Sequence, residues 1–483
     1  MTKQPAVFYE IFVRSFADSN GDGIGDLNGI RSKLDYLVDL GIEGIWLSPI
    51  FKSPSYHKYD VSDYFSVDPE YGTKEDLIQL INEAKEKGIV LILDLVINHT
   101  SSAHKWFRVA QNPKSQYRDY YHWLTKEEIR RRGIEKRKPT DDSGLEYPWH
   151  WPKYRVKEKY FGMFWSEMPD LNLANEQLKD EIISIAKYWL SLGIAGFRLD
   201  AAKHIFPSWE PAEKNHHFWK EFRSRLEEEY TEVYLVGEVW DTPQTVAPYF
   251  ESLQANFNID LSYDLKDLLK NGLDEKRLID KLLHSYKIFG EANSSFIDAT
   301  LLSNHDQTRI GTLLKGDLSK LKQAANILMT LPGQPFLYYG GEIGLLGDKP
   351  DEYIREPYPW ESASETHWIA RRNKVPDREY QLNLFNHYKS LIALRKNTEP
   401  LGTVFNNLQK SPLEQKGIFS FIRYSENESF LIIHNLNNER SKLILTESLS
   451  SYTHLVYSIG TEINIDDSFY IPAFGMLILA KTS

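Results

Sequence analysis

The chain has 483 residues, of which 41% are apolar and 26% charged, so it can fold around a large core and is not a disordered chain. Its 57 basic and 68 acidic residues give a net charge of -11, which disfavours a general binder of nucleic-acid backbones. It has no cysteine, which excludes disulfides, a thiolate nucleophile and a cysteine-ligated zinc site.

The start of the chain and its apolar runs give expectations about location. No apolar run reaches the length of about 18 residues that a membrane span requires. The first residues, Met-Thr-Lys-Gln-Pro, lack the apolar core of a signal peptide, and strand-like sequence begins at Ala6. We therefore expect a cytoplasmic protein without a membrane partner, which would be secreted only if a signal peptide had been removed. We also expect a monomer that does not bind nucleic acid.

Short apolar segments rich in β-forming residues recur along most of the chain, and amphipathic segments separate several of them. In chain order the apolar segments are Ala6–Val13, Gly44–Leu47, Val90–Ile97, Ile194–Leu199, Val233–Val236, Asn256–Ile259, Ala299–Leu302 and Phe336–Tyr339. The amphipathic segments include Arg31–Leu40, Lys74–Lys87 and Glu176–Leu192, which have the spacing of helices. Eight buried-type strands with helical crossovers predict an α/β fold, the (β/α)8 TIM barrel. An open, doubly wound sheet is the alternative fold that fits the same pattern of strands and helices.

The interval after the third predicted strand is too long to be a simple crossover. From His99 to Leu173 the sequence is irregular, dense in Trp, Tyr, Lys and Arg, and interrupted by Pro. We predict that residues 100–172 form an inserted subdomain, and that its basic stretch Lys126–Lys138 is a solvated helix rather than a binding patch. The barrel would then comprise residues 1–99 and 173–400.

The pattern changes after about residue 400 to short alternating segments. Strands are predicted at Gly417–Tyr424, Ser429–Asn435, Ser441–Leu445 and Tyr470–Leu479. This spacing is typical of antiparallel sheets, so residues 401–483 are predicted to form a C-terminal antiparallel β-sandwich domain.

Acidic residues follow three of the predicted barrel strands. Asp200, Glu238 and Asp306 each stand close after a strand, near an Arg, Trp or His residue. In barrel enzymes the reacting groups lie at the C-terminal ends of the strands. A single acid of this kind is usually a solvated or ion-paired side chain, but three on different strands favour a catalytic site.

Three carboxylates in this arrangement suit glycoside hydrolysis, which needs one protonated acid to release the sugar oxygen and one ionised carboxylate to attack or guide water. Arg198, two residues before Asp200, points to the same face of its strand and should favour the charged form of Asp200. A raised pKa would let Glu238 act as the acid. His99 and His305 could donate hydrogen bonds to sugar hydroxyls, although either alone could equally be a structural histidine.

Five ordered segments resemble the conserved regions of the alpha-amylase superfamily, glycoside hydrolase family 13. They are Asp94–His99, Gly196–His204, Gly237–Asp241 and Ser303–Asp306 at the strand ends, and Met168–Leu173 near the end of the inserted subdomain. Gly21–Gly29 resembles a further segment of the family. The resemblance spans residues 6 to about 395 in order, and the β-rich tail is similar to the family's third domain.

The resemblance implies a retaining mechanism that passes through a covalent glycosyl-enzyme. It assigns Asp200 as the nucleophile, Glu238 as the acid and then the base, and Asp306 as the carboxylate that binds the distorted sugar. A retaining pair should place the carboxyl groups of Asp200 and Glu238 about 5–5.5 Å apart. The substrate-binding residues that the resemblance implies are Tyr59, which would stack beneath the sugar, and Arg198, His99 and His305.

The segments that set specificity resemble more than one branch of the family. Ala201 and the pair Lys203-His204 are similar to true alpha-amylases, in which this pair contacts sugar on the leaving-group side. Met168–Asn172 mixes features of oligo-1,6-glucosidases and neopullulanases, so the chain resembles the subfamily between those two groups. We expect internal cleavage of alpha-1,4-glucosidic bonds in starch and maltooligosaccharides, with transglycosylation or some alpha-1,6 activity as additions. The alternatives are an exo-acting alpha-glucosidase or oligo-1,6-glucosidase, a neopullulanase-like enzyme, a transglycosylase and a non-catalytic carbohydrate-binding barrel.

Oxygen-bearing residues alternate in an N-terminal loop, Asp18-Ser-Asn20-Gly-Asp22-Gly-Ile24-Gly-Asp26. Such spacing can wrap a hard cation, and the resemblance implies the same, so the loop predicts a structural Ca²⁺ site. Its ligands would be Asp18, Asn20, Asp22, the carbonyl oxygen of Ile24, and Asp26. Gly29 stands where an EF-hand has its bidentate Glu, and an Asx-rich turn without metal is the alternative. Asn98 and the carbonyl of His204 resemble ligands of a separate calcium site, for which the sequence identifies no aspartate.

Overall fold

The structure is a computed structural model of the chain. It describes residues 5–481 apart from 138–143, 155, 275–276, 362–363, 403–406, 445–448 and 460–467. Within these residues, no helix is both long and apolar enough to cross a membrane.

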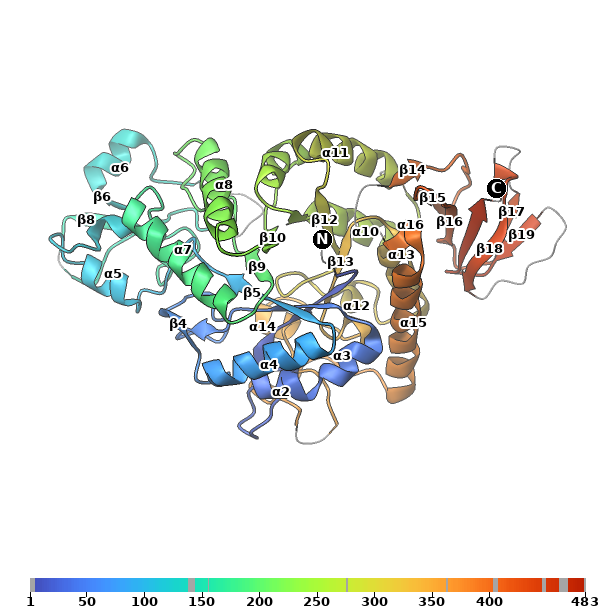
Figure 1. Ribbon diagram of the computed structural model, residues 1–483, viewed down its shortest axis with the longest axis horizontal. Coiled ribbons are helices and arrows are strands. Elements are labelled where there is room, and N and C mark those ends of the chain that lie inside the picture. The colour runs from blue at the N-terminus through green and yellow to red at the C-terminus, as the bar shows by residue number, and fades with distance from the viewer. Residues whose placement is uncertain are drawn as a thin grey trace.

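Eight parallel strands close into a barrel in the order β1-β13-β12-β11-β10-β9-β5-β2, which confirms the predicted barrel over the open sheet (Figure 1). The strands are β1 (Phe8–Ile11), β2 (Gly44–Leu47), β5 (Val90–Leu95), β9 (Gly196–Leu199), β10 (Tyr234–Gly237), β11 (Ala255–Phe257), β12 (Ile297–Leu301) and β13 (Gln334–Tyr338). Each lies within or overlaps one of the eight apolar segments of the sequence. The prediction succeeds because a strand buried on both faces leaves an unbroken apolar run.

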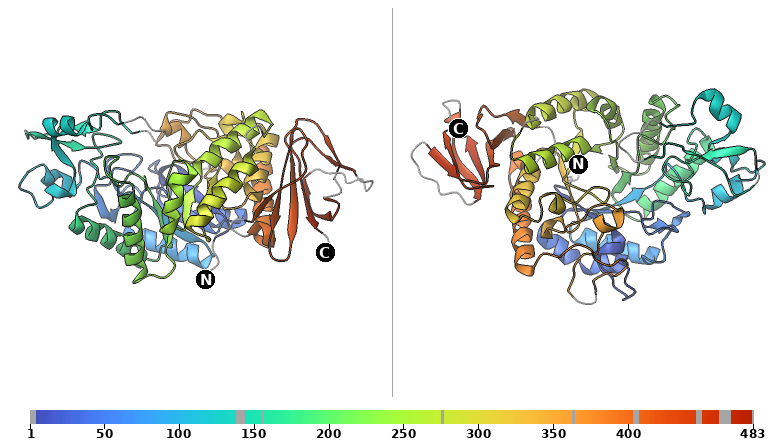
Figure 2. Two further views of the ribbon diagram at one scale, coloured as in Figure 1. Left: turned by 90° about the horizontal axis from the view of Figure 1, so that it is seen from above. Right: turned by 180° about the vertical axis from the view of Figure 1, so that it is seen from behind.

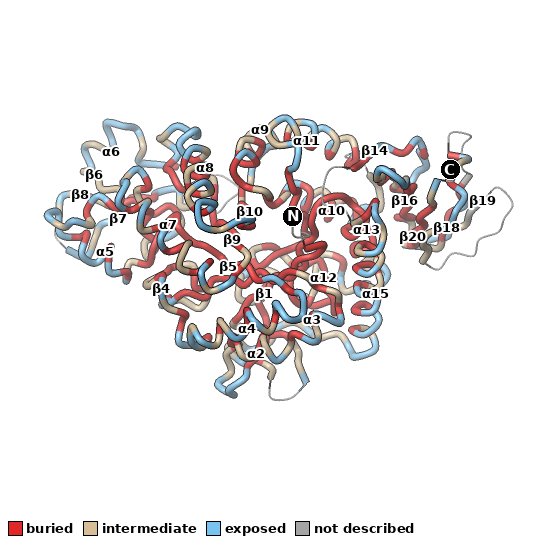
Figure 3. Tube along the Cα trace, in the orientation of Figure 1, coloured by how far each residue is buried: buried red, intermediate tan, exposed pale blue. Residues whose placement is uncertain are grey.

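Aromatic side chains fill the inside of the barrel. Phe8 stacks on Phe336 with ring centres 4.7 Å apart and on Tyr234 at 5.2 Å. Trp46 and Phe257 pack into the same interior cluster. These residues alternate along their strands with others that face the surrounding helices, so the barrel is a packed core. Figure 3 shows the strands as continuous buried segments at the centre of the molecule.

The helices that surround the barrel are α2 (Leu27–Ser32), α3 (Leu34–Leu40), α4 (Lys74–Glu86), α7 (Glu176–Ser191), α8 (Glu213–Glu227), α10 (Ile259–Asn271), α11 (Leu278–Ala292), α13 (Leu318–Thr330) and α15 (Arg378–Asn397). Two of the predicted helices are confirmed as α4 and α7. The predicted helix at Arg31–Leu40 is wrong in one respect, because Lys33 leaves the helical conformation and divides the segment into α2 and α3. Asp26 caps α2 by accepting a hydrogen bond from the backbone N–H of Gly29.

The segment between β5 and β9 forms a small lobe at one end of the molecule (Figures 1 and 2). It contains α5 (Lys105–Ala110), α6 (Lys126–Arg132) and a sheet in the order β6-β8-β7, formed by Trp123–Thr125, Glu158–Phe161 and Trp149–His150. The predicted basic helix is shorter than expected, because α6 ends at Gly133, whose backbone is left-handed. Lys138 lies outside the described residues.

The C-terminal strands lie at the opposite end of the molecule from this lobe (Figure 2). One sheet has the order β14-β15-β16-β20-β18 and a second pairs β17 with β19, all antiparallel as predicted. Their bounds are β14 (Leu408–Lys410), β15 (Ile418–Tyr424), β16 (Ser429–Asn435), β17 (Ser441–Ile444), β18 (Tyr452–Ile459), β19 (Ser468–Ile471) and β20 (Met476–Lys481).

Two details of the C-terminal prediction are wrong. The segment Tyr470–Leu479 is not one strand, since Pro472 and Gly475 lie in the turn that separates β19 in one sheet from β20 in the other. In addition, β14 and β18 were not predicted. The exact domain boundaries, at 99/100, 172/173 and 400/401, remain predictions.

A β-hairpin that precedes α4 positions part of the site. Strands β3 (Phe51–Lys52) and β4 (Asp63–Val67) pair and hold the loop that contains Tyr59. Trp189 of α7 anchors this hairpin, because its ring stacks on Phe51 with centres 4.8 Å apart and its Nε1–H donates to the carbonyl of Tyr64 at 2.8 Å. The loop is therefore fixed against the helix layer rather than free in solvent.

Candidate active site

A pocket of about 420 Å³ lies at the C-terminal ends of the barrel strands. Of the residues predicted from the sequence, the pocket is lined by Asp200, Glu238, Asp306, Tyr59, His99, Lys203 and His204. Arg198 and His305 lie directly behind this lining, at 1% and 0% exposure. The closed barrel thus brings together all nine predicted catalytic and substrate-binding residues, although they are spread over most of the chain.

Arg198 lies at the centre of a group of buried carboxylates. Its Nη1 lies 2.8 Å from Asp94 Oδ1 and 2.6 Å from Asp200 Oδ1, and its Nη2 lies 2.7 Å from Glu238 Oε2. Asp94 lies in β5, and Asp200 and Glu238 directly follow β9 and β10, so the guanidinium connects three neighbouring strands. Asp94 lies in the segment Asp94–His99, but it was not among the predicted site residues.

Glu238 is held by three hydrogen-bond donors. Its Oε2 accepts from the backbone N–H of Ala201 at 3.1 Å in addition to Arg198, and its Oε1 accepts from Trp240 Nε1 at 3.1 Å. Burial raises the pKa of Glu238, Arg198 opposes the rise, and the nearby Asp200 adds to it. The net direction is upward, as expected of a carboxyl that serves as an acid.

The expectation for Asp200 needs a correction. Arg198 does favour the ionised form of Asp200, but burial outweighs it and the pKa of Asp200 is raised rather than lowered. The pKa of Asp94 is likewise raised by burial, to about 7. One guanidinium can compensate only part of the negative charge that three ionised carboxyl groups would carry. Protonation of these buried carboxyl groups is therefore favoured.

A second charge cluster surrounds Asp306. Its Oδ2 lies 3.0 Å from His305 Nε2, and its Oδ1 accepts from Arg355 Nη2 at 2.8 Å. On the other side of the imidazole, His305 Nδ1 lies 2.6 Å from Glu10 Oε1. Burial alone would lower the pKa of His305, but Asp306 and Glu10 outweigh it and raise the pKa to about 10.

Asp306 is the carboxylate that stays ionised. Burial would raise its pKa, yet His305 and Arg355 hold the pKa of Asp306 far below its usual range. The two acid environments are therefore opposite, with a raised pKa at Glu238 and a depressed one at Asp306. Such a separation is typical of sites that need one acid and one fixed negative charge.

Tyr59 joins the two clusters. Its hydroxyl donates to Asp94 Oδ2 at 3.1 Å and lies 2.7 Å from His305 Nε2, and its ring stacks on that of His305 with centres 5.5 Å apart. The ring nitrogens of His99 contact the carbonyl of Tyr59 and the Asn98 side chain, at 3.2 Å each. Both predicted histidines therefore contact protein groups, and hydrogen bonds from them to a sugar stay a prediction.

Lys203 and His204 lie at the edge of the pocket near Trp240. Lys203 Nζ donates to the carbonyl of Trp240 and forms an ion pair with Asp241 at 3.3 Å. The ring of His204 lies edge-on to Phe164, with centres 6.2 Å apart. Trp240 and Phe164 also line the pocket and give it apolar walls.

Glu10 and Arg355 are site residues that the sequence analysis missed. Glu10 lies on β1 inside an apolar segment, where an acidic residue is itself a signal because burial of an unpaired charge is costly. Arg355 follows α14 (Asp351–Ile354) in a region without a motif. Its Nε donates to the carbonyl of His305 at 3.0 Å and its Nη1 to the hydroxyl of Tyr56 at 3.2 Å. No local pattern identifies it, because all of these partners are distant in sequence.

The predicted metal residues are close together in a tightly turned loop. Asp18 accepts hydrogen bonds from the backbone of Asn20, Gly21 and Gly23, at 2.7–2.9 Å. Asp22 accepts from the Ile24 N–H at 2.8 Å. Among the described residues, none of the acids Asp18, Asp22 and Asp26 forms an ion pair with a Lys, Arg or His side chain. Their negative charge is therefore uncompensated, which fits a hard cation.

Two further observations concern metal binding by side chains. Among the described residues, no group of three or more His, Asp or Glu side chains is arranged to hold a metal ion. The Asp170 side chain, from the lobe between β5 and β9, lies beside Asn98, whose Nδ2 donates to Asp170 Oδ2 at 3.3 Å. Burial raises the pKa of Asp170 to about 7.

Comparisons with known proteins agree with this geometry. A family model described as the alpha amylase catalytic domain matches residues 10–403, and one for the alpha-amylase SusG C-terminal domain matches residues 418–478. The Alpha-amylase 3 of Dictyoglomus thermophilum is 44% identical over 445 residues, which cover 89% of this chain and 85% of the relative. The 4-alpha-glucanotransferase of Thermotoga neapolitana is 31% identical over 447 residues, covering 89% and 95%. The crystal structure of alpha-amylase from H. orenii aligns with a TM-score of 0.89 at 39% identity, covering 100% of both chains.

Replacing Glu10 with Gln should lower the pKa of His305 from about 10 by about 1 or more, because one of its two carboxylate partners loses its charge. The folded pKa of His305 exceeds its ordinary value of 6.5, so the imidazolium stabilises the fold fully below pH 6.5. That contribution is lost as the pH rises from 6.5 through about 10, and the loss should be smaller in the variant. NMR titration of ¹³Cε1-labelled histidines measures the pKa, with His387 as the internal control. An unchanged pKa of His305 would contradict the assigned contact.

Proposed function

The chain belongs to the alpha-amylase family of glycoside hydrolases, and from this premise we propose that it hydrolyses internal alpha-1,4-glucosidic bonds with retention of configuration. The proposed substrates are starch and maltooligosaccharides. The observation that carries the proposal is the placement of Asp200, Glu238 and Asp306 around one pocket, with Arg198 contacting the first two.

In the proposed reaction, Asp200 attacks the anomeric carbon while Glu238 protonates the glycosidic oxygen. The bond between that carbon and oxygen breaks, the shortened glucan leaves as an alcohol, and a covalent glycosyl-enzyme forms on Asp200. Glu238 then takes a proton from water, whose oxygen attacks the same carbon and releases Asp200. Because both steps invert the anomeric carbon, the product keeps the original configuration.

The electrostatics of Glu238 and Asp306 support the roles proposed for these two residues. The raised pKa of Glu238 keeps a proton available for the leaving oxygen, whereas the depressed pKa of Asp306 provides a fixed negative charge for the oxocarbenium-like state. The guanidinium of Arg198 contacts Asp200 and Glu238 with different nitrogens, which favours the short separation of about 5–5.5 Å expected of a retaining pair. As a carboxylate becomes free on Asp200, Arg198 can stabilise it.

The preference for internal alpha-1,4 bonds rests on Ala201 and on the pair Lys203-His204 at the pocket edge. The alternative is an exo-acting alpha-glucosidase, oligo-1,6-glucosidase or neopullulanase-like enzyme. Transfer to sugar acceptors is part of the proposal, since the same glycosyl-enzyme serves water or a sugar hydroxyl, and one relative is named a 4-alpha-glucanotransferase. The complete set of three carboxylates disfavours a non-catalytic barrel.

We also propose that Asp18, Asn20, Asp22, Ile24 and Asp26 hold a structural Ca²⁺. The uncompensated charge of the three acids supports this site, and bound Ca²⁺ would supply a positive charge that ties the loop together. The cation has no part in the proposed reaction, which the carboxyl groups carry out. Cytoplasmic location and a monomeric state remain predictions.

A product time course with a linear maltohexaose tests the proposed activity. Early maltose and maltotriose, separated by chromatography, are expected from internal cleavage. Products longer than the substrate would reveal transfer. Glucose as the sole early product, or the absence of any reaction, would reject internal alpha-1,4 cleavage in favour of the exo-acting or alpha-1,6 alternative.

Replacing Glu238 with Gln should reduce kcat/KM on maltooligosaccharides by about 10²–10⁴-fold, because the leaving oxygen then receives no proton from this residue. Formation of the glycosyl-enzyme from an activated 4-nitrophenyl glycoside should fall far less, since 4-nitrophenolate leaves without protonation. The alkaline limb of the pH profile should also disappear, because wild-type activity is lost as the pH rises through the raised pKa of Glu238. Stopped-flow release of 4-nitrophenol measures the step. Glu251→Gln, an exposed glutamate, is the matched control. Equal losses on both substrates would argue against the acid role.

Adding Ca²⁺ to chelator-treated protein should raise the Tm if the loop binds the cation, by an amount equivalent to about 2.7 kcal/mol at a hundredfold excess over Kd. Asp22→Asn should weaken this response, because it removes one carboxylate ligand. Asp39→Asn, an exposed acid that pairs with Lys389, should leave the response intact. Thermal unfolding followed by circular dichroism measures the shift. A Tm that is insensitive to Ca²⁺ in the wild-type chain would reject the site.

A further inference from the structure

The two carboxyl oxygens of Glu238 have different hydrogen-bond partners. Its Oε2 accepts from Arg198 Nη2 at 2.7 Å and from the backbone N–H of Ala201 at 3.1 Å. Its Oε1 accepts from the indole Nε1–H of Trp240 at 3.1 Å. Among the described residues, one oxygen therefore faces a cation and a backbone donor, whereas the other faces a single neutral donor.

This difference determines which oxygen carries the proton when Glu238 is in its acid form. A proton on Oε2 would compete with two N–H donors, one of them positively charged, and would weaken both hydrogen bonds. A proton on Oε1 competes only with the neutral N–H of Trp240. Oε1 is therefore the oxygen that gives up and takes back the proton.

The partners of Oε2 are fixed by the barrel. Arg198 is 1% exposed, and the backbone of Ala201 is left-handed, at φ 45°, which a non-glycine residue keeps only where its surroundings hold it. The backbone of Glu238 is fixed as well, since its N–H donates to the carbonyl of Leu199 and its carbonyl accepts from the N–H of Ala202, at 3.1 Å each. The last torsion of a glutamate side chain has only a broad intrinsic preference, so the contact at Oε1 fixes the rotation of the carboxyl plane.

Trp240 is anchored through both its side chain and its backbone. Its side chain packs against the apolar cluster inside the barrel. Its carbonyl accepts from Lys203 Nζ, and Lys203 also forms an ion pair with Asp241 at 3.3 Å. Trp240 stands two positions after Glu238, and both residues line the catalytic pocket. The indole N–H is therefore held at Oε1 by groups that do not depend on bound substrate.

A hydrogen bond to a carboxylate favours its ionised form, so the indole N–H opposes the burial that raises the pKa of Glu238. The two proposed steps need both forms of this residue, because Glu238 is an acid in the first and a base in the second. We propose that Trp240 is a positioning residue, whose indole N–H orients Oε1 of Glu238 and stabilises the carboxylate that remains once Oε1 has given up its proton. This role rests on the proposed function, since it concerns the same acid.

The proton moves to and from Oε1 in the two steps. In the first step the Oε1–H bond breaks, its proton goes to the glycosidic oxygen, and its electron pair stays on the carboxylate. In the second step Oε1 takes a proton from the attacking water, which restores the acid. Between the steps, the N–H of Trp240 faces one oxygen of the carboxylate and the guanidinium of Arg198 faces the other. Fixed protein donors thus stabilise the negative charge without reorganising.

Replacing Trp240 with Phe tests the proposal, because Phe keeps an aromatic ring and removes the N–H. The pKa of Glu238 should rise by about 1 or more, since a hydrogen bond to its charged form is lost. ¹³C NMR of the whole chain, labelled at the glutamate carboxyl carbon, measures this pKa, and the signal of Glu238 is the one that disappears in Glu238→Gln. Trp360→Phe is the matched control, because Trp360 is also half-buried and its Nε1–H donates to the carbonyl of Phe16. This control should leave the pKa of Glu238 unchanged.

The activity of Trp240→Phe gives a second readout. On maltohexaose its kcat should fall about tenfold, and the alkaline limb of kcat/KM should move to higher pH together with the pKa of Glu238. A loss of packing alone would leave that limb in place. Should the variant not fold, Trp240→Leu removes the same donor.

An unchanged or lowered pKa of Glu238 in the Trp240 variant would overturn the proposal, as would an equal rise in Trp360→Phe. The NMR measurement needs no turnover, so this result is distinct from a failure of the proposed function. A wild-type chain that leaves maltohexaose uncleaved would reject that function, and with it the role of Trp240.

Discussion

The buried guanidinium of Arg198 is the interaction on which the rest of the site depends. It lies against Asp94 in β5 and against Asp200 and Glu238, which follow the neighbouring strands β9 and β10. Removing one partner from a buried ion pair costs about 3–5 kcal/mol, so each carboxyl is held where the guanidinium can reach it. Burial raises the pKa of each acid by more than this one positive charge lowers it, so Glu238 can hold the proton that its proposed role requires.

A second positive cluster gives the opposite result at Asp306. His305 and Arg355 both contact its carboxyl group, and they keep its pKa far below the usual range in spite of burial. Tyr59 joins this cluster to the first, since its hydroxyl contacts both Asp94 and His305. Two carboxylates of the same pocket therefore differ in protonation because their neighbours differ in charge, which is the usual basis for separate acid and charge-stabilising roles.

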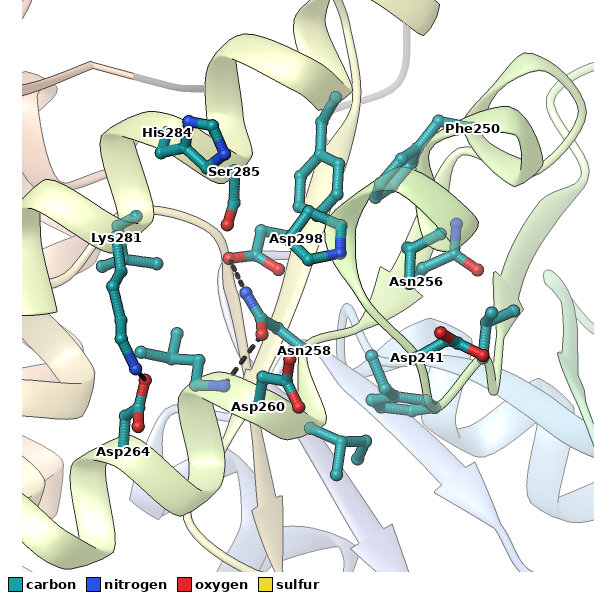
Figure 4. A pocket seen from close by; sticks show the side chains of 18 of the residues that line it. Asp241, Phe250, Asn256, Asn258, Asp260, Asp264, Lys281, His284, Ser285 and Asp298 are labelled. Atoms are coloured by element: carbon teal, nitrogen blue, oxygen red, sulfur yellow. Dashed lines mark hydrogen bonds and ion pairs between the residues drawn. The ribbon is translucent and has the colours of Figure 1, made fainter. Parts of the chain in front are cut away.

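The barrel also explains how one short segment of chain contributes both to the catalytic pocket and to the side of the barrel that faces the helices. Successive residues after β10 face opposite directions, so Glu238 and Trp240 line the catalytic pocket while Val239 and Asp241 line a cavity between the barrel strands and the helices α9 (Pro243–Val246), α10 and α11 (Figure 4). Asn256 on β11 and Asp298 on β12 stand in register and place two buried polar side chains on the outer face of the barrel.

The sequence by itself determined the eight barrel strands and the positions of Asp200, Glu238 and Asp306, because buried parallel strands leave apolar runs and their C-terminal ends converge at one face. Only the tertiary structure decided which groups those acids contact. His305 and Glu10 are 295 positions apart, yet their side chains lie 2.6 Å from each other. The pKa direction of Asp200 could not be read from its neighbour Arg198 alone, because burial depends on every segment packed around it. Local sequence patterns therefore identify the strands, whereas the protonation of each acid depends on which charged groups the fold brings close to it.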